Sequence, residues 1–162
     1  MITAWLDLYL GMEAAASTLR QYAPALIPGL LQTPEYATAI LSLRAGVTPT
    51  ETEQRVRLRM DRQRLFTRRA PKPPTMQVRL DEGVLRRPIA DRAAWARQLA
   101  HLVNVQQKHD VSVRVIPHQA GPHEATSAGP FVVLEFPGRG ARAPEPTTVY
   151  CRRAVPRSSG RD

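Results

Sequence analysis

Apolar residues recur at three- and four-residue steps along the first part of the chain, which is the spacing of amphipathic helices. The repeat over residues 5–22 predicts one helix that ends before Pro24. A second helix is expected to begin at Thr33, a residue type that caps helices, and to end at Gly46. We expect these two helices to pack as a hairpin through the loop at residues 28–29.

Two further helices are predicted from capping residues and apolar stripes. A third helix over residues 48–68 begins with the capping-box pair Thr48 and Glu51. The proline-rich residues 69–74 cannot continue this helix and predict an extended connector. A fourth helix is predicted over residues 91–107, where apolar side chains again fall on one stripe.

The second half of the chain has the shorter period of β-strands. Strands are predicted at residues 76–80, 111–116, 131–136 and 147–151. Residues 131–134 are almost continuously apolar, which favours a central strand. The sequence therefore predicts an α+β fold in which a helical N-terminal half packs on a small, mainly antiparallel sheet.

Length and composition suit one cytoplasmic domain. The 162 residues, 43% of them hydrophobic, predict a single domain at 1–151, with a helical part at 1–70 and a mixed part at 75–151. The polar, arginine-rich residues 152–162 are expected to form a disordered basic tail. The single cysteine, Cys151, excludes an internal disulfide and suits a reducing compartment. No long apolar run or secretory leader is visible, so we expect no membrane contact.

The formal charge of +9 raises the question of an anionic partner. Nearly all of the basic residues are arginines, which GC-rich codons also produce, so the charge alone is weak evidence for binding. The third helix is the densest positive segment, and its candidate phosphate-binding residues are Arg55, Arg57, Arg64, Arg68 and Arg69. A direct nucleic-acid-binding protein that uses this helix is one alternative. A solvated helix face whose arginines pair with nearby acids is the other.

Groups that could support catalysis or metal binding are few. Asp81 and Glu82 lie at a predicted strand end, but the arginines that follow them favour a salt-bridged turn over a metal site. His118 and His123 lie in a glycine-containing loop whose spacing matches no metal motif. The sequence places no base beside Cys151, and it contains no phosphate-binding loop or nucleophile elbow. We therefore expect no enzyme activity, no cofactor and no metal, and an enzyme with Asp81, Glu82 and His123 in its site is a third interpretation.

A series of sequence blocks follows one order from residue 5 to residue 150. The blocks are Trp5, Glu13 and Ala16; Tyr22; 27–37 (IPGLLQTPEYA); 59–64 (RMDRQR); 80–88 (LDEGVLRRP); Gln98, Leu99 and Leu102; 113–117 (VRVIP); Gly121 and His123; 129–131 (GPF); and 149–150 (VY). In these blocks the chain resembles a domain of unknown function that follows an Xre-type helix-turn-helix in actinobacterial regulators, a group also described as antitoxin-like transcriptional regulators.

The resemblance implies a regulatory domain that binds a small partner protein or a small-molecule effector. DNA would be contacted only indirectly or through the basic helix, and a homodimer is a further expectation. The family's helix-turn-helix would precede Trp5, whereas this chain begins at Met1, so we expect it to lack the DNA-binding head. The family pattern also continues beyond Tyr150 with an acidic residue, where this chain has Cys151, which suggests a shortened copy.

The resemblance also places a binding cleft between three segments. These are the turn at 28–36, the helix face at 59–63 and the turn at 81–82, with Arg62 expected to pair with Asp81. The expected ligand- or partner-binding residues are Gln32, Tyr36, Arg59, Arg62, Gln63, Asp81, Glu82 and His123.

Overall fold

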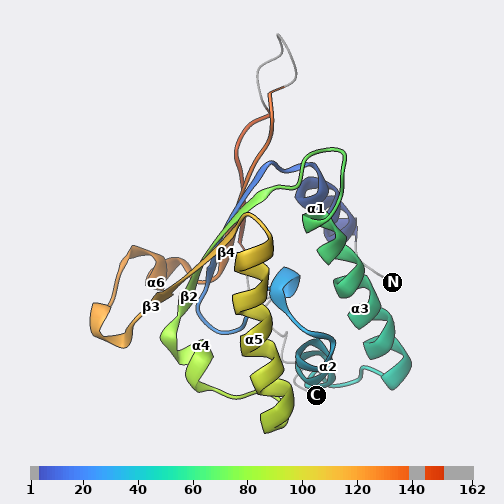
Figure 1. Ribbon diagram of the computed structural model, residues 1–162, viewed down its shortest axis with the longest axis vertical. Helices are drawn as coiled ribbons and strands as arrows, with labels where there is room; N and C mark the ends of the chain where they lie inside the picture. Colours follow the sequence, from blue (N-terminus) through green and yellow to red (C-terminus); the bar gives the residue numbers. More distant parts are fainter. Residues whose placement is uncertain (1–3, 139–144, 152–162) are drawn as a thin grey trace, which may run out of the picture.

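A five-stranded mixed sheet forms the centre of the described part of the protein (Figure 1). The computed structural model describes residues 4–138 and 145–151, and the predicted basic tail at 152–162 lies outside them. The strands lie in the order β3-β2-β1-β4-β5. Their bounds are β1 Thr18–Ala23, β2 Thr75–Asp81, β3 Val111–Ile116, β4 Phe131–Glu135 and β5 Thr148–Cys151. The first three strands are mutually parallel, whereas β4 is antiparallel to β1, and β5 to β4.

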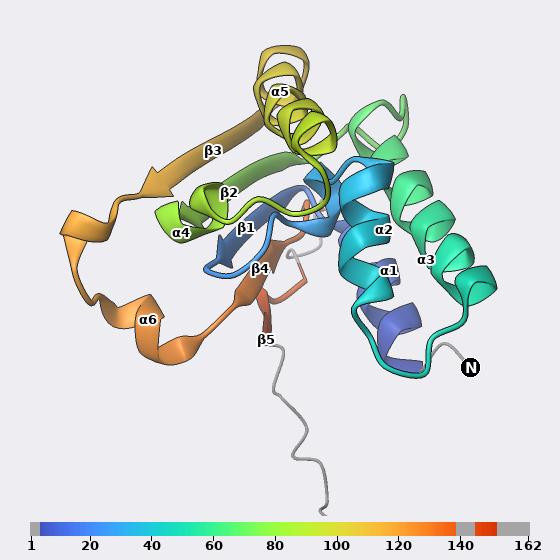
Figure 2. The same ribbon diagram turned by 90° about the horizontal axis from the view of Figure 1, so that it is seen from below.

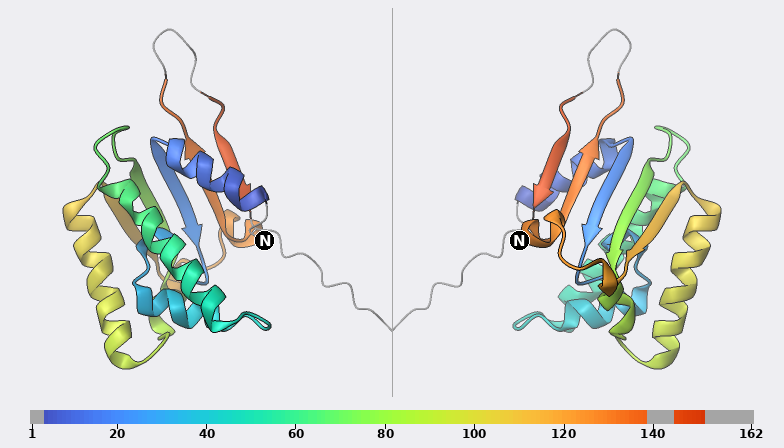
Figure 3. Two further views of the ribbon diagram at one scale, coloured as in Figure 1. Left: turned by 90° about the vertical axis from the view of Figure 1, so that its right-hand side faces the viewer. Right: turned by 90° about the vertical axis from the view of Figure 1, so that its left-hand side faces the viewer.

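The longer helices cover one face of this sheet (Figures 2 and 3). They are α1 Ala4–Ala15, α2 Pro34–Ser42, α3 Pro49–Arg62 and α5 Arg92–Lys108. Two helices of five residues each, α4 Glu82–Arg86 and α6 Glu124–Ala128, lie in the connections that follow β2 and β3. Short 3₁₀ turns occupy η1 Gly29–Leu31, η2 Gln63–Phe66 and η3 His118–Ala120. In Figure 1, α6 lies on the opposite side of the strands from α3 and α5.

The hydrophobic core lies between the sheet and these longer helices. The strands contribute side chains with exposed fractions of 1% or less, namely Leu19, Met76, Val78, Leu80 and Leu134. The helices and the segment after β1 contribute Ile27, Leu31, Tyr36, Leu102 and Val105 to the same cluster. Burial of this apolar surface is the main source of stability, at about 25 cal/mol for each Å² removed from water.

Several predicted helix starts and strands are confirmed. Thr33 accepts a hydrogen bond from the amide of Tyr36 at the start of α2, over 3.3 Å. Thr48 and Glu51 form the expected reciprocal capping box at the start of α3. β3 occupies the predicted residues 111–116, and the other three predicted strands agree to within a residue or so. Where a capping residue or a short alternating run of apolar residues decides the local structure, the sequence is sufficient to predict the helix start or the strand.

The predicted helix over residues 5–22 is wrong in its second half. α1 ends at Ala15, and β1 then takes the central place in the sheet. Leu19 is 1% exposed beneath the helices and Tyr22 is 5% exposed on the opposite face. Because Tyr22 is buried on the face opposite Leu19, the buried residues of β1 do not simply alternate, and their spacing imitates a helix. The predicted hairpin of the first two helices is wrong for the same reason, since β1 separates α1 from α2.

The prediction of an α+β fold is confirmed, but the mainly antiparallel sheet is not. Two of the strand pairings, β1 with β2 and β2 with β3, are parallel. Parallel neighbours require crossover connections, and the helices α2 to α5 supply them. The strand predicted to be central, β4, lies inside the sheet between β1 and β5.

The second face of the sheet carries none of the longer helices, as the right-hand view of Figure 3 shows. The strand register arranges its outward side chains in rows, because directly paired residues point to the same face. One row is Arg114, Arg79, Tyr22, Phe131 and Cys151, and the next is Ser112, Gln77, Arg20, Val133 and Val149. We call this surface the open face.

Candidate functional site

Three of the glutamines hold a buried loop in place. The loop is formed by residues 27–33 and passes between α3 and α5. Gln98 of α5 accepts a hydrogen bond from the Thr33 amide, over 2.7 Å, and donates one to the Leu31 carbonyl, over 2.8 Å. Gln63 donates to the Gln32 carbonyl over 2.6 Å. Buried backbone groups need such partners, so these contacts account for the polar side chains at this position.

Gln32 and Tyr36 complete the network from within the loop and its following helix. The Gln32 amide donates to the Ile27 carbonyl over 2.6 Å, and its side-chain oxygen accepts from Arg59. The Tyr36 hydroxyl accepts from the Ile27 amide over 3.2 Å. Burial raises the pKa of Tyr36, although this backbone hydrogen bond opposes the shift. Gln32 is 2% exposed and Tyr36 1% exposed, so both side chains face the interior and not a solvent-filled cleft.

Arg62 lies beside this network but pairs with a different helix. Its Nε and Nη2 atoms donate to the two carboxylate oxygens of Glu13 on α1, over 2.8 and 2.7 Å. Glu13 is 3% exposed. The expected pair between Arg62 and Asp81 is therefore not formed, because a carboxylate that the sequence places on the first helix reaches the guanidinium instead.

Asp81 and Glu82 lie elsewhere, at the carboxyl end of β2. Asp81 caps α4 by accepting a hydrogen bond from the Gly83 amide over 2.7 Å. Glu82 accepts from the His118 amide over 2.9 Å and pairs with Arg86. The predicted cleft between the 28–36 turn, α3 and the 81–82 turn is thus wrong. Its first two segments share the buried network, while the third belongs to a separate region.

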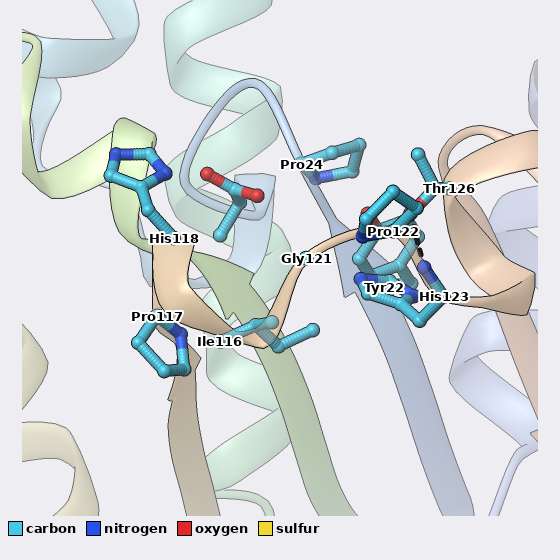
Figure 4. Close-up of a pocket in the computed structure, with 10 residues that line it drawn as sticks. Tyr22, Pro24, Ile116, Pro117, His118, Gly121, Pro122, His123 and Thr126 are labelled. Atoms are coloured by element: carbon cyan, nitrogen blue, oxygen red, sulfur yellow. Dashed lines mark hydrogen bonds between the residues drawn. The ribbon is translucent and has the colours of Figure 1, made fainter.

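That region contains a pocket of about 310 Å³ on the open face (Figure 4). The parallel strands β1, β2 and β3 end there, and the connection at 117–130 closes its outer side. Its wall includes Tyr22, Asp81, His118 and His123, together with prolines at 24, 117 and 122. Figure 4 shows His118 and His123 on opposite sides of the pocket, with Gly121 between them.

The polar groups of this pocket are held by nearby backbone. A Cβ added at Gly83 would lie 2.9 Å from Asp81 Oδ1 and 3.5 Å from His118 Cε1, so glycine lets both side chains approach the start of α4. Within the described residues Asp81 Oδ2 makes no hydrogen bond, and neither does the His118 ring. His123 packs edge-on against Tyr22, with ring centroids 5.5 Å apart. The pocket therefore combines a carboxylate acceptor with aromatic and proline walls.

The arginines proposed for nucleic-acid binding do not form one positive face. Arg57 pairs with Glu53 and Arg64 pairs with Asp61 along an exposed stripe that runs from α3 into η2 and whose charges alternate. Arg68 donates to the backbone carbonyls of Ala14 and Lys72. Arg55 is half-buried and Arg69 is exposed. Alternating charges and arginines that bind the chain's own backbone give phosphates little unpaired positive charge.

Sequence reasoning missed several residues that shape these sites. Tyr22 was assigned to a helix, although it lies on the pocket wall at the end of β1. Glu13 and Gln98 occur among the family blocks, but no contact could be assigned to them without the fold. His118 was seen only as a loop histidine, because its proximity to Asp81 follows from the parallel pairing of β2 with β3. Only His123 and Asp81 among the predicted binding residues line the pocket.

Comparison with known proteins identifies the chain at the level of its family. Within the residues that the structure describes, no group of three metal-binding side chains gathers, and no helix is long and apolar enough to cross a membrane. No curated protein and no solved structure matches the chain. One family profile matches residues 6–156, nearly the whole chain. The protein therefore belongs to the family described as a domain of unknown function, DUF5753.

Proposed function

We propose that this chain is the effector-binding domain of a helix-turn-helix transcriptional regulator of the antitoxin-like type. In this proposal a small-molecule effector binds in the pocket on the open face and the domain has no catalytic role. The regulatory context rests on the ordered sequence blocks described above. The position of the pocket supports the binding role.

The location of the pocket at the carboxyl ends of three parallel strands is the observation that carries the proposal. In open sheets with parallel strands, ligands bind outside the carboxyl ends, near the point where the strand order reverses. Here the parallel strands β2 and β3 lie on one side of β1, and the antiparallel strand β4 lies on the other, so the parallel part of the sheet ends beside β1. Tyr22 at the end of β1 and Asp81 at the end of β2 both line the pocket.

The side chains indicate the chemistry of the effector. Asp81 offers a carboxyl oxygen that makes no hydrogen bond within the described residues, and carboxylates form their strongest hydrogen bonds with cationic donors. The Tyr22 and His123 rings and the neighbouring prolines offer flat, largely apolar contacts. At about 310 Å³ the pocket lies at the small end of the usual range for ligand sites, roughly 300 to 1,000 Å³. The matching ligand is a small heteroaromatic molecule that carries an amine or amidine.

Direct nucleic-acid binding through the basic helix receives less support. The exposed arginines of α3 alternate with acids, and Arg68 is engaged with the backbone. The net charge of +9 is the main observation in favour of nucleic-acid binding. A steep loss of DNA affinity with rising salt, abolished in an Arg57→Gln/Arg64→Gln variant, would favour this alternative over effector binding.

The proposed effector site can be tested with a fragment library of amine- and amidine-bearing heteroaromatic compounds. Compounds that raise the melting temperature of the full chain are titrated by calorimetry against wild type, Asp81→Asn and Asp61→Asn. Asparagine keeps an oxygen for the Gly83 amide, so the turn should persist while the charge is lost.

The proposal expects at least a tenfold weaker affinity in Asp81→Asn and no change in Asp61→Asn, whose carboxylate lies on exposed α3. Equal affinity for both variants, or no saturable binding of any compound, would overturn it.

A further inference from the structure

The open face carries two arginines that the described residues leave unpaired. Arg79 on β2 and Arg114 on β3 are directly opposite in the strand register, and both are exposed. Neither makes a hydrogen bond or a salt bridge within residues 4–138 and 145–151. Like charges directly opposite on neighbouring strands are unfavourable. The face would therefore gain from an anionic group placed between them.

The same face becomes apolar toward its other edge. Beyond Arg20, which is neutralised by Glu135 over 3.0 Å, the rows continue with Val133 and Val149. Val149 is 57% exposed on the edge strand β5. The open face thus has a basic half over β2 and β3 and an apolar half over β4 and β5, which also includes the half-buried Phe131. Neighbouring strands lie about 4.8 Å apart, so the five strands make the open face about 19 Å wide. This width is enough for one helix of about 10 Å diameter.

We propose that the open face is a docking surface for an acidic, amphipathic segment of a partner protein, anchored by Arg79 and Arg114. Acidic side chains of that segment bind the arginine pair, and its apolar side chains cover Val133 and Val149. Arginine is enriched in protein interfaces, where its planar group binds carboxylates through two hydrogen bonds. A contact of this size suits a short segment and a transient complex.

Charge and side-chain type favour a protein partner over a nucleic acid or a second copy. Glu135 holds Arg20 in an ion pair, so the positive charge left on this face is that of Arg79 and Arg114, and Val133 and Val149 offer no flat ring for base stacking. Tyr22 is 5% exposed and lines the effector pocket beside His123, so its ring is not part of the surface around Arg79, Arg114 and Val149. A second copy would bring the same two arginines, and the chain as a whole carries a charge of +9.

The anchoring residues Arg79, Arg114 and Val149 lie outside the effector pocket at the end of the same face, because none of them lines it. The test of the docking surface therefore does not depend on the pocket being a ligand site. A random 15-residue peptide display library is selected against the full chain, in parallel with three variants. The variants are Arg79→Gln/Arg114→Gln, Val149→Ser and the matched control Arg57→Gln/Arg64→Gln, which removes the same charge from exposed positions on α3 and η2.

The expected result is enrichment of peptides that combine Asp or Glu with Leu, Ile or Val. Synthetic versions of the enriched peptides should bind at least tenfold more weakly to Arg79→Gln/Arg114→Gln and severalfold more weakly to Val149→Ser, with little change in the control. Unfolding curves should show that the first variant is at least as stable as wild type, because it loses a like-charge contact.

Three results would overturn the proposal. The first is selection without acidic enrichment, and the second is an equal loss of affinity in both double-arginine variants. The third is tight binding of a 20-nucleotide oligo(dT) that depends on Arg79 and Arg114, since the same face would then recognise phosphates.

Discussion

Arg62 of α3 and Glu13 of α1 form a two-point ion pair, with donor to acceptor distances of 2.8 and 2.7 Å. The Glu13 side chain is 4% exposed and that of Arg62 is 20% exposed. Burial favours the neutral form of Arg62, but the hydrogen bonds to Glu13 outweigh it and raise the pKa of the arginine. The central carbon of the Arg62 guanidinium lies 5.9 Å from the centroid of the Tyr9 ring. Burial, and next the charge of Glu13, raise the pKa of the Tyr9 hydroxyl. The pair ties α1 to the helical layer.

Removing either partner of this pair should strongly destabilise the protein. Glu13→Ala or Arg62→Ala leaves the other charge buried without its partner, which costs about 3–5 kcal/mol. Arg62→Lys should also be costly, because a lysine cannot make both hydrogen bonds in one plane. Urea unfolding followed by circular dichroism measures these losses.

A double-mutant cycle identifies the partner of Arg62. The losses of Glu13→Ala and Arg62→Ala should not add in the double variant, because the second substitution removes the charge that the first left unpaired. The losses of Asp81→Ala and Arg62→Ala should add. If the losses of Glu13→Ala and Arg62→Ala added and those of Asp81→Ala and Arg62→Ala did not, the partner of Arg62 would be Asp81, as the sequence suggested.

Gln98→Leu should destabilise the protein without changing its core volume greatly. The substitution leaves the Thr33 amide and the Leu31 carbonyl buried without partners, at about 1–3 kcal/mol for each group. Gln107→Leu on the exposed side of the same helix is the control and should change the free energy of unfolding by less than about 0.5 kcal/mol. Similar small effects of both substitutions would show that the buried network contributes little.

Alanine should have opposite effects at two glycines. At Gly83 the new Cβ would lie 2.9 Å from Asp81 Oδ1, so the turn must shift, and the loss should be about 1–3 kcal/mol. At Gly11 no atom lies within 4 Å of the new Cβ, and alanine in the interior of α1 should stabilise by about 0.5–1 kcal/mol. Thermal unfolding of the two variants compares the signs directly. A neutral Gly83→Ala would contradict the tight approach at the start of α4.

The contact between Glu82 and the pocket wall should depend on pH. The hydrogen bond from the His118 amide, and next the hydrogen bond from the Arg86 side chain, lower the pKa of Glu82 below its ordinary value of 4.5. The carboxylate therefore stabilises the fold above about pH 4.5, and this contribution is lost as the pH falls through the lower, folded-state pKa. The difference in unfolding free energy between wild type and Glu82→Gln should be largest near pH 7 and should shrink below pH 4.5. A difference that does not change with pH would show that Glu82 is not ionised in this contact.

The fold could be predicted wherever short-range chemistry decides the structure. Thr33, Thr48 and Asp91 all cap helices as their residue types suggest, because a cap needs only its own next three residues. β1 could not be predicted in the same way. Its place between β2 and β4 depends on residues that are far away in the sequence, and the pairing overrides the helical spacing of Leu19 and Tyr22.

The site was harder to predict because polar residues near turns look alike in the sequence. Gln32 and Gln63 were expected to bind a ligand, yet they supply partners to a buried loop. Asp81 and His123 were both expected to bind a ligand or partner, and they share the pocket on the open face. The distinction follows from which backbone groups the fold buries, and a single sequence does not contain that information.

The central claim is that the glutamine network is structural and that effectors bind at the pocket. The most direct test is a ¹H–¹⁵N spectrum of the labelled chain, recorded while the best-binding amine fragment is added. The account predicts saturable shifts at the backbone amides of Gly121, His123 and Thr126, with the side-chain amides of Gln32, Gln63 and Gln98 unmoved. Shifts confined to those glutamine amides, with none around His123, would contradict it.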